Sequence, residues 1–185
     1  MANDYKQLVK DLLEEGFVIQ GVTIDGKRGV AKAFRDIPVQ MCHFHQVAII
    51  KRYLTSRPKL EASIELLKIC RRIPTSTQAR FTDALCQWHS KHKTFLEEKT
   101  INPTTGKPVS THAKLVAAYR GLSTNLPYLF TYKNYKEFKM PNTTNALDGG
   151  VFSQLKKLIK LHQGLAKKRK VKLIDEFLDQ YNKKR

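Results

Sequence analysis

The first forty residues carry two different hydrophobic patterns. In residues 5–15 the apolar positions follow the helical period, and Gly16 comes next as a stop signal. Residues 17–24 are rich in β-branched side chains and predict a strand, and residues 37–42 predict a second one. The stretch 30–34 between them predicts a short helix. A strand, a helix and a strand in this order are typical of a parallel crossover.

From residue 45 onward the apolar positions recur at helical spacing, which predicts an all-α middle segment. The loop at residues 102–108 interrupts it. A further helix is expected to begin after the loop at 141–145, to run to about His162 and to end at Gly164. The other predicted helices have their apolar faces at residues 47–54, 60–67, 81–95, 115–122 and 173–181.

The charge of the chain points to a polyanionic partner. Its 185 residues include 34 Lys plus Arg and 16 Asp plus Glu, a formal net charge of +18, and 41% of them are hydrophobic, as in a globular domain. Residues 1–45 hold six basic and six acidic side chains, whereas residues 151–185 hold 11 and three, a net charge of +8. Such an excess favours a phosphate backbone as partner, with a solvated basic surface as the alternative.

The sequence gives no sign of secretion or of membrane insertion. The first twenty residues are rich in charged side chains, and no apolar run approaches the ~18 residues of a membrane span. The three cysteines, an odd number, argue against a disulfide framework and for a reducing compartment. We therefore expect a cytoplasmic, nucleoid-associated protein without a membrane partner.

Two acidic residues stand out by their position. Asp25 follows the first predicted strand, at the strand end where open α/β sheets place their ligands. Asp148 opens a basic helix beside Gly149 and Gly150, which leave room for close approach. Two carboxylates could ligate Mg²⁺. The alternative is an Asp-Gly turn at Asp25 and a helix-dipole role for Asp148.

Four motifs occur in a characteristic order: TIDGKRGV at residues 23–30, QMCHFHQ at 40–46, TTNALDGG at 143–150 and LHQGL at 161–165. Together they resemble the catalytic domain of bacterial insertion-sequence transposases of the Mutator-like superfamily, in the variant that carries a zinc-binding amino-terminal domain. The resemblance implies a ribonuclease H-like core with an α-helical insertion and three metal-binding acids. It matches Asp25 to the second acid and Asp148 to the third.

The resemblance also implies a division of the chain and a metal cofactor. Residues 1–54 would form part of the ribonuclease H-like core, residues 55–125 the helical insertion, and residues 126–185 the loop and basic helices of the core. Asp25 and Asp148 would bind Mg²⁺ or Mn²⁺, and two such ions can activate a water or a DNA 3′-hydroxyl for attack on a phosphodiester.

The chain departs from the family pattern in two ways. The third acid of the family is usually Glu, whereas position 148 is Asp. In the family, the first acid lies on antiparallel strands that precede the helix matched here at residues 5–15. The residues before that helix in this chain cannot encode those strands. We therefore expect a truncated transposase with weak metal binding and no activity alone. The unpaired edge of the strand ending at Asp25 predicts self-association or pairing with a complementing transposase chain.

Two Cys-x-x-His pairs raise the question of zinc. Cys42 and His45 match the superfamily, and Cys86 and His89 lie within a predicted helix. Two such pairs could together complete a tetrahedral site. The second pair lacks the geometry of a zinc knuckle, so zinc is the disfavoured interpretation. A buried Cys42 and a hydrogen-bonded His45 that order the wall of the active site are the favoured roles.

Aromatic and basic side chains supply candidate DNA contacts. Trp88 has the spacing of a core residue, but related transposases use an aromatic residue of the insertion to stack on a flipped base. Aromatic residues alternate with lysines over residues 128–139, and they either grip DNA or cover the core. The basic residues expected to bind phosphates in the last two helices are Lys156, Lys157, Lys160, Lys167, Lys168, Arg169 and Lys170.

The sequence thus predicts a truncated DNA transposase whose partners are transposon ends and target DNA. By resemblance, its chemistry is metal-dependent strand cleavage and strand transfer. A non-catalytic basic nucleic-acid-binding protein or regulator derived from a transposase is the first alternative. A decayed reading frame whose product has no function is the second.

Overall fold

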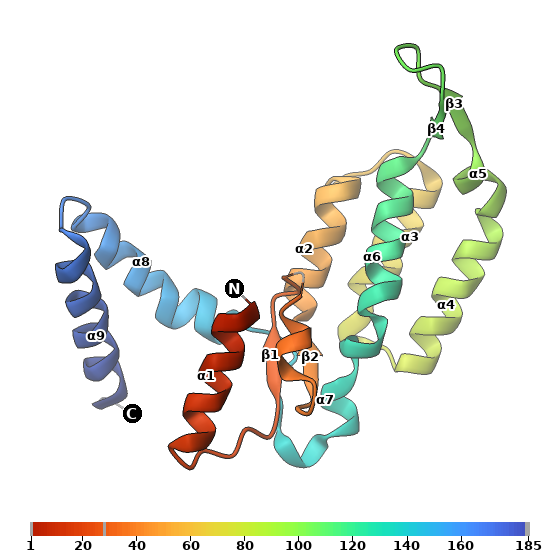
Figure 1. The fold of residues 1–185 in the computed structure, drawn as a ribbon. Helices are drawn as coiled ribbons and strands as arrows, with labels where there is room; N and C mark the ends of the chain where they lie inside the picture. The colour runs from red at the N-terminus through yellow and green to blue at the C-terminus, as the bar shows by residue number, and fades with distance from the viewer. Residues whose placement is uncertain (1, 28, 184–185) are drawn as a thin grey trace. The chain divides into compact units, whose positions relative to one another are not determined.

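The computed structural model describes residues 2–27 and 29–183. The chain forms two compact units, residues 1–143 and residues 144–185. The larger unit combines a small parallel sheet with a set of helices, and the smaller unit is helical (Figure 1). The chain therefore belongs to the mixed α and β class and is mostly helical, as the sequence pattern predicts.

The larger unit begins with a strand–helix–strand crossover. β1 (Val22–Ile24) pairs in parallel with β2 (Val39–Met41), so that Val22 lies opposite Val39 and Ile24 opposite Met41. The 3₁₀ helix η1 (Ala31–Phe34) connects the two strands. α1 (Ala2–Glu14) precedes them and ends before Gly16, whose φ of +86° suits a helix stop. The predicted helix and parallel crossover are confirmed.

The strands are shorter than the β-branched pattern predicts. Residues 17–21 are not part of β1, and Val18 is 85% exposed. Among the described residues β1 pairs only with β2, so residues 17–21 have no strand beside them that would satisfy their backbone groups. Ile24, Val30, Phe34 and Val39 form a small core under the sheet.

A bundle of helices holds the main core of the larger unit. α2 packs against both α3 and α6, and α4 packs against α3, as the neighbouring ribbons of Figure 1 show. The buried side chains at its centre include Ile50, Leu66, Phe81, Trp88 and Leu122. The helices are α2 (His43–Leu54), α3 (Glu61–Arg71), η2 (Ile73–Thr75), α4 (Gln78–Lys91), α5 (Lys93–Glu97) and α6 (Ala113–Leu129).

Two predictions for this bundle were wrong in detail. The continuous helix expected over residues 81–95 is broken at His92, which caps the end of α4 and precedes α5. The middle segment is not all-α, because β3 (Lys99–Ile101) and β4 (Pro108–Ser110) form an antiparallel hairpin around the predicted loop. The hairpin strands are three residues long and mostly exposed, so they carry no hydrophobic alternation that a sequence pattern could show.

The last part of the larger unit returns to the sheet. α7 (Thr131–Asn134) and η3 (Lys136–Phe138) follow α6. The Thr23 hydroxyl donates to the carbonyl of Pro141 (2.7 Å), and the amide of His43 donates to the carbonyl of Asn142 (2.9 Å). These bonds fix residues 141–142 beside β1 and the start of α2.

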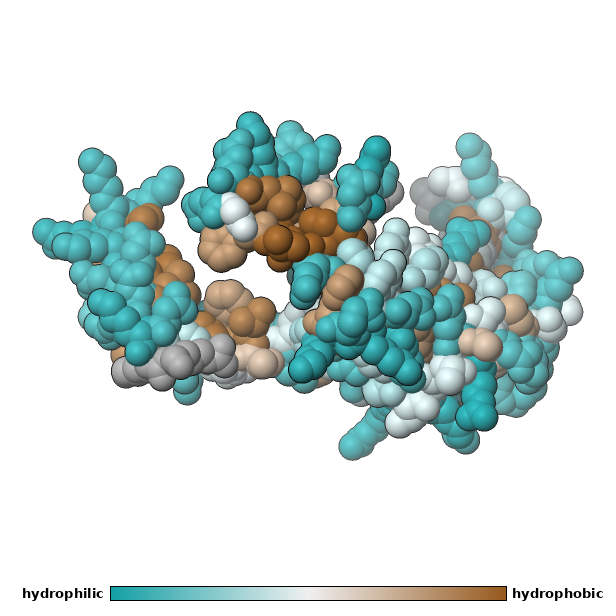
Figure 2. All heavy atoms as spheres, turned by 90° about the horizontal axis from the view of Figure 1, so that it is seen from below, coloured by the Kyte–Doolittle hydropathy of each residue, from teal (hydrophilic) through white to brown (hydrophobic). Residues whose placement is uncertain are grey.

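The smaller unit consists of η4 (Ala146–Val151), which is a π-helix, α8 (Phe152–Leu161) and α9 (Lys167–Lys183). α8 ends at Leu161 with His162 as its C-cap residue, which agrees with the predicted end at about His162. Val151 and Leu155 are buried, whereas none of the side chains of α9 is. Both hydrophilic residues (teal) and hydrophobic ones (brown) lie at the surface of this unit, at the left of Figure 2.

Candidate functional site

Asp25 is the first residue after β1, at the carboxyl end of the parallel sheet. Its side chain is exposed, and its Oδ1 accepts the backbone N–H of Lys27 at 2.9 Å. Gly26 has a φ of +81°, and a Cβ at this position would overlap the thioether of Met41. The Asp-Gly turn is therefore confirmed, and it directs a carboxylate into solvent at a strand end where α/β sheets place their ligands.

Cys42 follows β2 as Asp25 follows β1, so both residues lie at the same end of the parallel pair. The amide of Cys42 donates to the carbonyl of Ile24 at 2.8 Å, its side chain is fully buried, and it is the N-cap residue of α2. The predicted burial of Cys42 is thus confirmed. His45, in the first turn of α2, is half-buried, and its ring packs edge-on against that of Phe44. Its role in ordering an active-site wall stays a prediction.

A buried polar network beside these residues was missed by the sequence analysis. The Gln40 amide donates to the carbonyls of Met41 (2.7 Å) and Leu129 (3.0 Å), and its Oε1 accepts the N–H of Tyr132 (2.9 Å). His43 Nε2 lies 2.7 Å from the same Leu129 carbonyl, so it carries the proton of the neutral ring. Burial lowers the pKa of His43, which keeps it neutral. The network joins β2 and α2 to α6 and α7.

Asp148 lies in the π-helix of the smaller unit. The hydroxyl of Thr144 donates to its Oδ2 at 2.7 Å, and the amides of Leu147 and Asp148 both donate to the carbonyl of Thr144. The side chain of Asp148 is exposed. Single π-turns occur often at functional sites, because they change the direction in which a side chain projects. The Thr-x-x-x-Asp contact fixes one oxygen of the carboxylate.

The two candidate ligands belong to different units, so their meeting at one metal ion stays a prediction. Within residues 2–27 and 29–183 there is no group of three or more His, Cys, Asp or Glu side chains that could hold a metal. Cys86 is exposed on α4, and the ring of His89 stacks on Tyr119 at 4.6 Å. The two Cys-x-x-His pairs therefore do not form one site among the described residues. The three cysteines are free thiols.

Trp88 belongs to the core of the helical bundle. It is 3% exposed, its indole N–H donates to the carbonyl of Ala62 at 2.9 Å, and its ring packs against those of His92 and Tyr119. A ring in this position has no face to offer to a base. The assignment of Trp88 to DNA binding is therefore corrected to core packing.

Some of the aromatic and basic residues in the range 128–139 belong to the core, and others are exposed where they could contact DNA. Phe130 is buried, and the Lys133 ammonium donates to the carbonyl of Ser76 at 2.6 Å, so both belong to the fold. Tyr135, which stacks on Phe138, is exposed, as are Lys136 and Lys139. These exposed residues keep open the prediction of a DNA contact.

The basic residues of the smaller unit lie at its surface. Among the described residues of α8 and α9, Lys172 forms an ion pair, at 3.9 Å with Glu176. The seven residues predicted to bind phosphates form none within that part of the chain. Lys156, Lys157, Lys160, Lys167, Lys168 and Arg169 are exposed, and Lys170 is half-buried.

Comparisons with protein-family models, with curated proteins and with solved structures find no match to this chain. In the part of the chain that the structure describes, no helix has the length and apolar character needed to span a membrane.

Proposed function

We propose that this chain supplies two metal-binding acids, Asp25 and Asp148, to a ribonuclease H-like DNA transposase. The observation that carries the proposal is the position of Asp25. It lies in the matched motif and in a tight turn at the carboxyl end of a parallel strand, with its carboxylate exposed. Asp148, in the third matched motif, is likewise exposed and lies in η4, which directly precedes the basic helix α8.

The chemistry would require both carboxylates at one pair of ions. Divalent ions held between them would activate a water or a DNA 3′-hydroxyl and stabilise the leaving oxygen in an in-line attack. The 185 residues offer no match to the first acid of the family. We therefore expect this chain alone to bind Mn²⁺ or Mg²⁺ weakly and not to join DNA strands.

Mn²⁺ titration followed by electron paramagnetic resonance tests this proposal. Asp25→Asn and Asp148→Asn keep the shape of each side chain, and each is expected to abolish the bound Mn²⁺ signal. Asp36→Asn and Asp175→Asn, at exposed positions outside the motifs, are matched controls that should leave it unchanged. Equal Mn²⁺ binding by all five proteins would refute the shared site, and strand joining by the purified chain would refute its inactivity.

The exposed lysines of α8 and α9 that form no ion pair with a described residue favour a second candidate, a non-catalytic DNA-binding protein or regulator. In that case neutralising residues 167–170 with glutamine would weaken duplex DNA binding, whereas Asp25→Asn and Asp148→Asn would change neither DNA binding nor Mn²⁺ binding. A variant that neutralises Lys6, Lys10, Lys99 and Lys107 is the charge-matched control. Binding that falls equally in both charge variants would contradict a localised DNA-binding cluster.

A further inference from the structure

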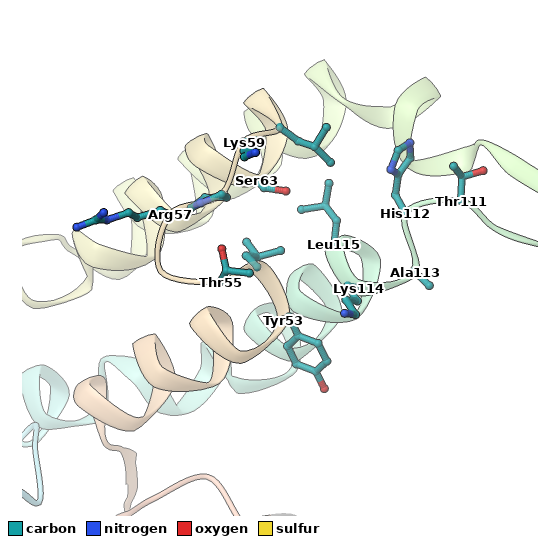
Figure 3. A pocket seen from close by; sticks show the side chains of 13 residues that line it. Tyr53, Thr55, Arg57, Lys59, Ser63, Thr111, His112, Ala113, Lys114 and Leu115 are labelled. Carbon is teal, nitrogen blue, oxygen red and sulfur yellow. The ribbon is translucent and has the colours of Figure 1, made fainter.

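A cavity of about 610 Å³ opens in the larger unit, away from both candidate acids in the sequence. Its walls come from the end of α2 and the loop after it, the start of α3, the end of the β3–β4 hairpin and the first turn of α6 (Figure 3). We call it the α3–α6 cavity. Its volume lies within the ~300–1,000 Å³ typical of small-ligand sites.

Two helices begin at this cavity, and neither is capped by a side chain. Leu60 is the N-cap residue of α3 and His112 that of α6, and neither side chain accepts a hydrogen bond from the first turn. The first amides of a helix have no partner within it and carry a partial positive charge. Such amides favour an anion at the start of each helix.

Ser63 gives an independent sign of a ligand. It lines the cavity and is only 5% exposed, yet its hydroxyl forms no hydrogen bond with any residue that the structure describes. Figure 3 shows its oxygen turned toward the space beside Leu115. The oxygen itself opens to the cavity, so the hydroxyl is free to donate a hydrogen bond to a polar ligand that enters there.

The charges around the cavity fit an anion. Lys59 lies on the α3 side and Lys114 on the α6 side, and neither forms an ion pair with a described residue. Glu61, the first residue of α3, pairs with Lys91 at 2.8 Å. Glu98, which lies between α5 and β3, pairs with the N-cap residue His112 of α6 at 2.9 Å. Arg57 also lines the cavity, so three cations that form no ion pair with a described residue, Arg57, Lys59 and Lys114, surround the uncapped helix starts.

The backbone at the entrance is strained in a way that shapes the cavity. Thr55, on its wall, has φ +68° and ψ 174°, a region that is almost restricted to glycine. This conformation turns the chain from the end of α2 toward Lys59 and α3. Strained residues of this kind persist where the surrounding structure fixes them, and they cluster at binding sites.

We propose that the α3–α6 cavity binds a phosphate group, held by the Ser63 hydroxyl and the first amides of α6 and neutralised by Lys59 and Lys114. A phosphate offers several acceptor oxygens to these donors at once, which suits both the hydroxyl and the two ammonium groups better than a neutral ligand. The phosphate comes either as a free ion or from a DNA strand. The proposal is independent of the transposase assignment, because it involves neither Asp25 nor Asp148.

Two probes separate these sources in the full chain. Inorganic phosphate is titrated while the melting temperature is followed, with sodium chloride at equal ionic strength as reference. Duplex DNA is titrated by fluorescence anisotropy. Ser63→Ala is the charge-neutral test variant, Lys59→Gln with Lys114→Gln is the charge variant, and Lys99→Gln with Lys107→Gln on the hairpin is the matched control.

If free phosphate is the ligand, it raises the melting temperature saturably, and Ser63→Ala weakens its affinity by about tenfold, as expected for a hydrogen bond to a charged group. If DNA supplies the phosphate, inorganic phosphate has no such effect, and Ser63→Ala weakens DNA binding although it changes no charge. Unliganded Ser63→Ala is expected to melt no lower than the parent chain, which shows that it folds. No response to phosphate together with unchanged DNA affinity in Ser63→Ala would overturn the proposal.

Discussion

Replacing Trp88 separates a core role from a DNA-stacking role. Trp88→Phe removes the hydrogen bond to Ala62, worth about 0.5–1.5 kcal/mol, and replaces the indole that packs against His92 and Tyr119 by a smaller ring. Trp→Ala in a core costs about 3–5 kcal/mol, and Phe keeps most of the ring. We therefore expect the free energy of unfolding to fall by about 2 kcal/mol in Trp88→Phe and by about 4 kcal/mol in Trp88→Ala.

Urea unfolding followed by far-UV circular dichroism measures these losses, because the signal does not depend on the single tryptophan. Phe44→Leu, at a position that is 57% exposed, is the control and should change the free energy by less than about 0.5 kcal/mol. DNA affinity, measured where Trp88→Phe is still folded, should stay unchanged. The core role would be refuted if Trp88→Phe kept the free energy of unfolding of the parent chain but lost ~1–3 kcal/mol of DNA-binding free energy, the contribution expected of base stacking.

Three further changes test charge, titration and strain. The logarithm of DNA affinity should fall linearly with the logarithm of salt concentration, and neutralising residues 167–170 should make this slope shallower by up to about 3–4. A parent chain whose affinity does not depend on salt would refute this prediction. Because burial depresses the pKa of His43, the unfolded chain binds its proton first, so stability should fall as pH drops below about 6.5, and His43→Gln should flatten this part of a urea-midpoint profile. Thr55→Gly should raise the free energy of unfolding by about 1 kcal/mol, since the relief of strain exceeds the added chain entropy; a destabilised variant would show that Thr55 is not strained.

The sequence pattern predicts those elements whose residues face a core. The β-branched residues of β1 and β2 lie in or beside a buried sheet, and their parallel pairing was predicted from the crossover pattern. The β-branched pattern predicts a strand that is too long, because it includes residues 17–21, where exposed residues such as Val18 have the same β propensity as buried ones. The hairpin at 99–110 was missed because its strands bury nothing.

The buried histidine shows a different limit. The Cys-x-x-His spacing points to His45, whereas the histidine that is buried and hydrogen-bonded in the core is His43. A signal was present, because positions 43, 46 and 50 share one face of a helix and Ile50 is the apolar residue among them. Apolar spacing at residues 47, 50 and 54 does not by itself show that polar residues such as His43 and Gln46 are buried in the same helix.

The local surroundings of each candidate acid depend on neighbouring residues, whereas the distance between the two acids depends on the arrangement of the two units. A turn such as Asp25-Gly26 follows from three or four neighbouring residues, so the sequence and the structure agree on it. The contact between Thr144 and Asp148 is also local, because it spans a single helical turn. A shared metal needs the units 1–143 and 144–185 in one arrangement, which depends on the surfaces that they bury together. A divalent ion bound by both carboxylates would itself stabilise that arrangement, because a ligand that binds one arrangement alone shifts the population toward it. Loss of Mn²⁺ binding in either Asn variant would therefore report on the arrangement of the units as well as on the ligands.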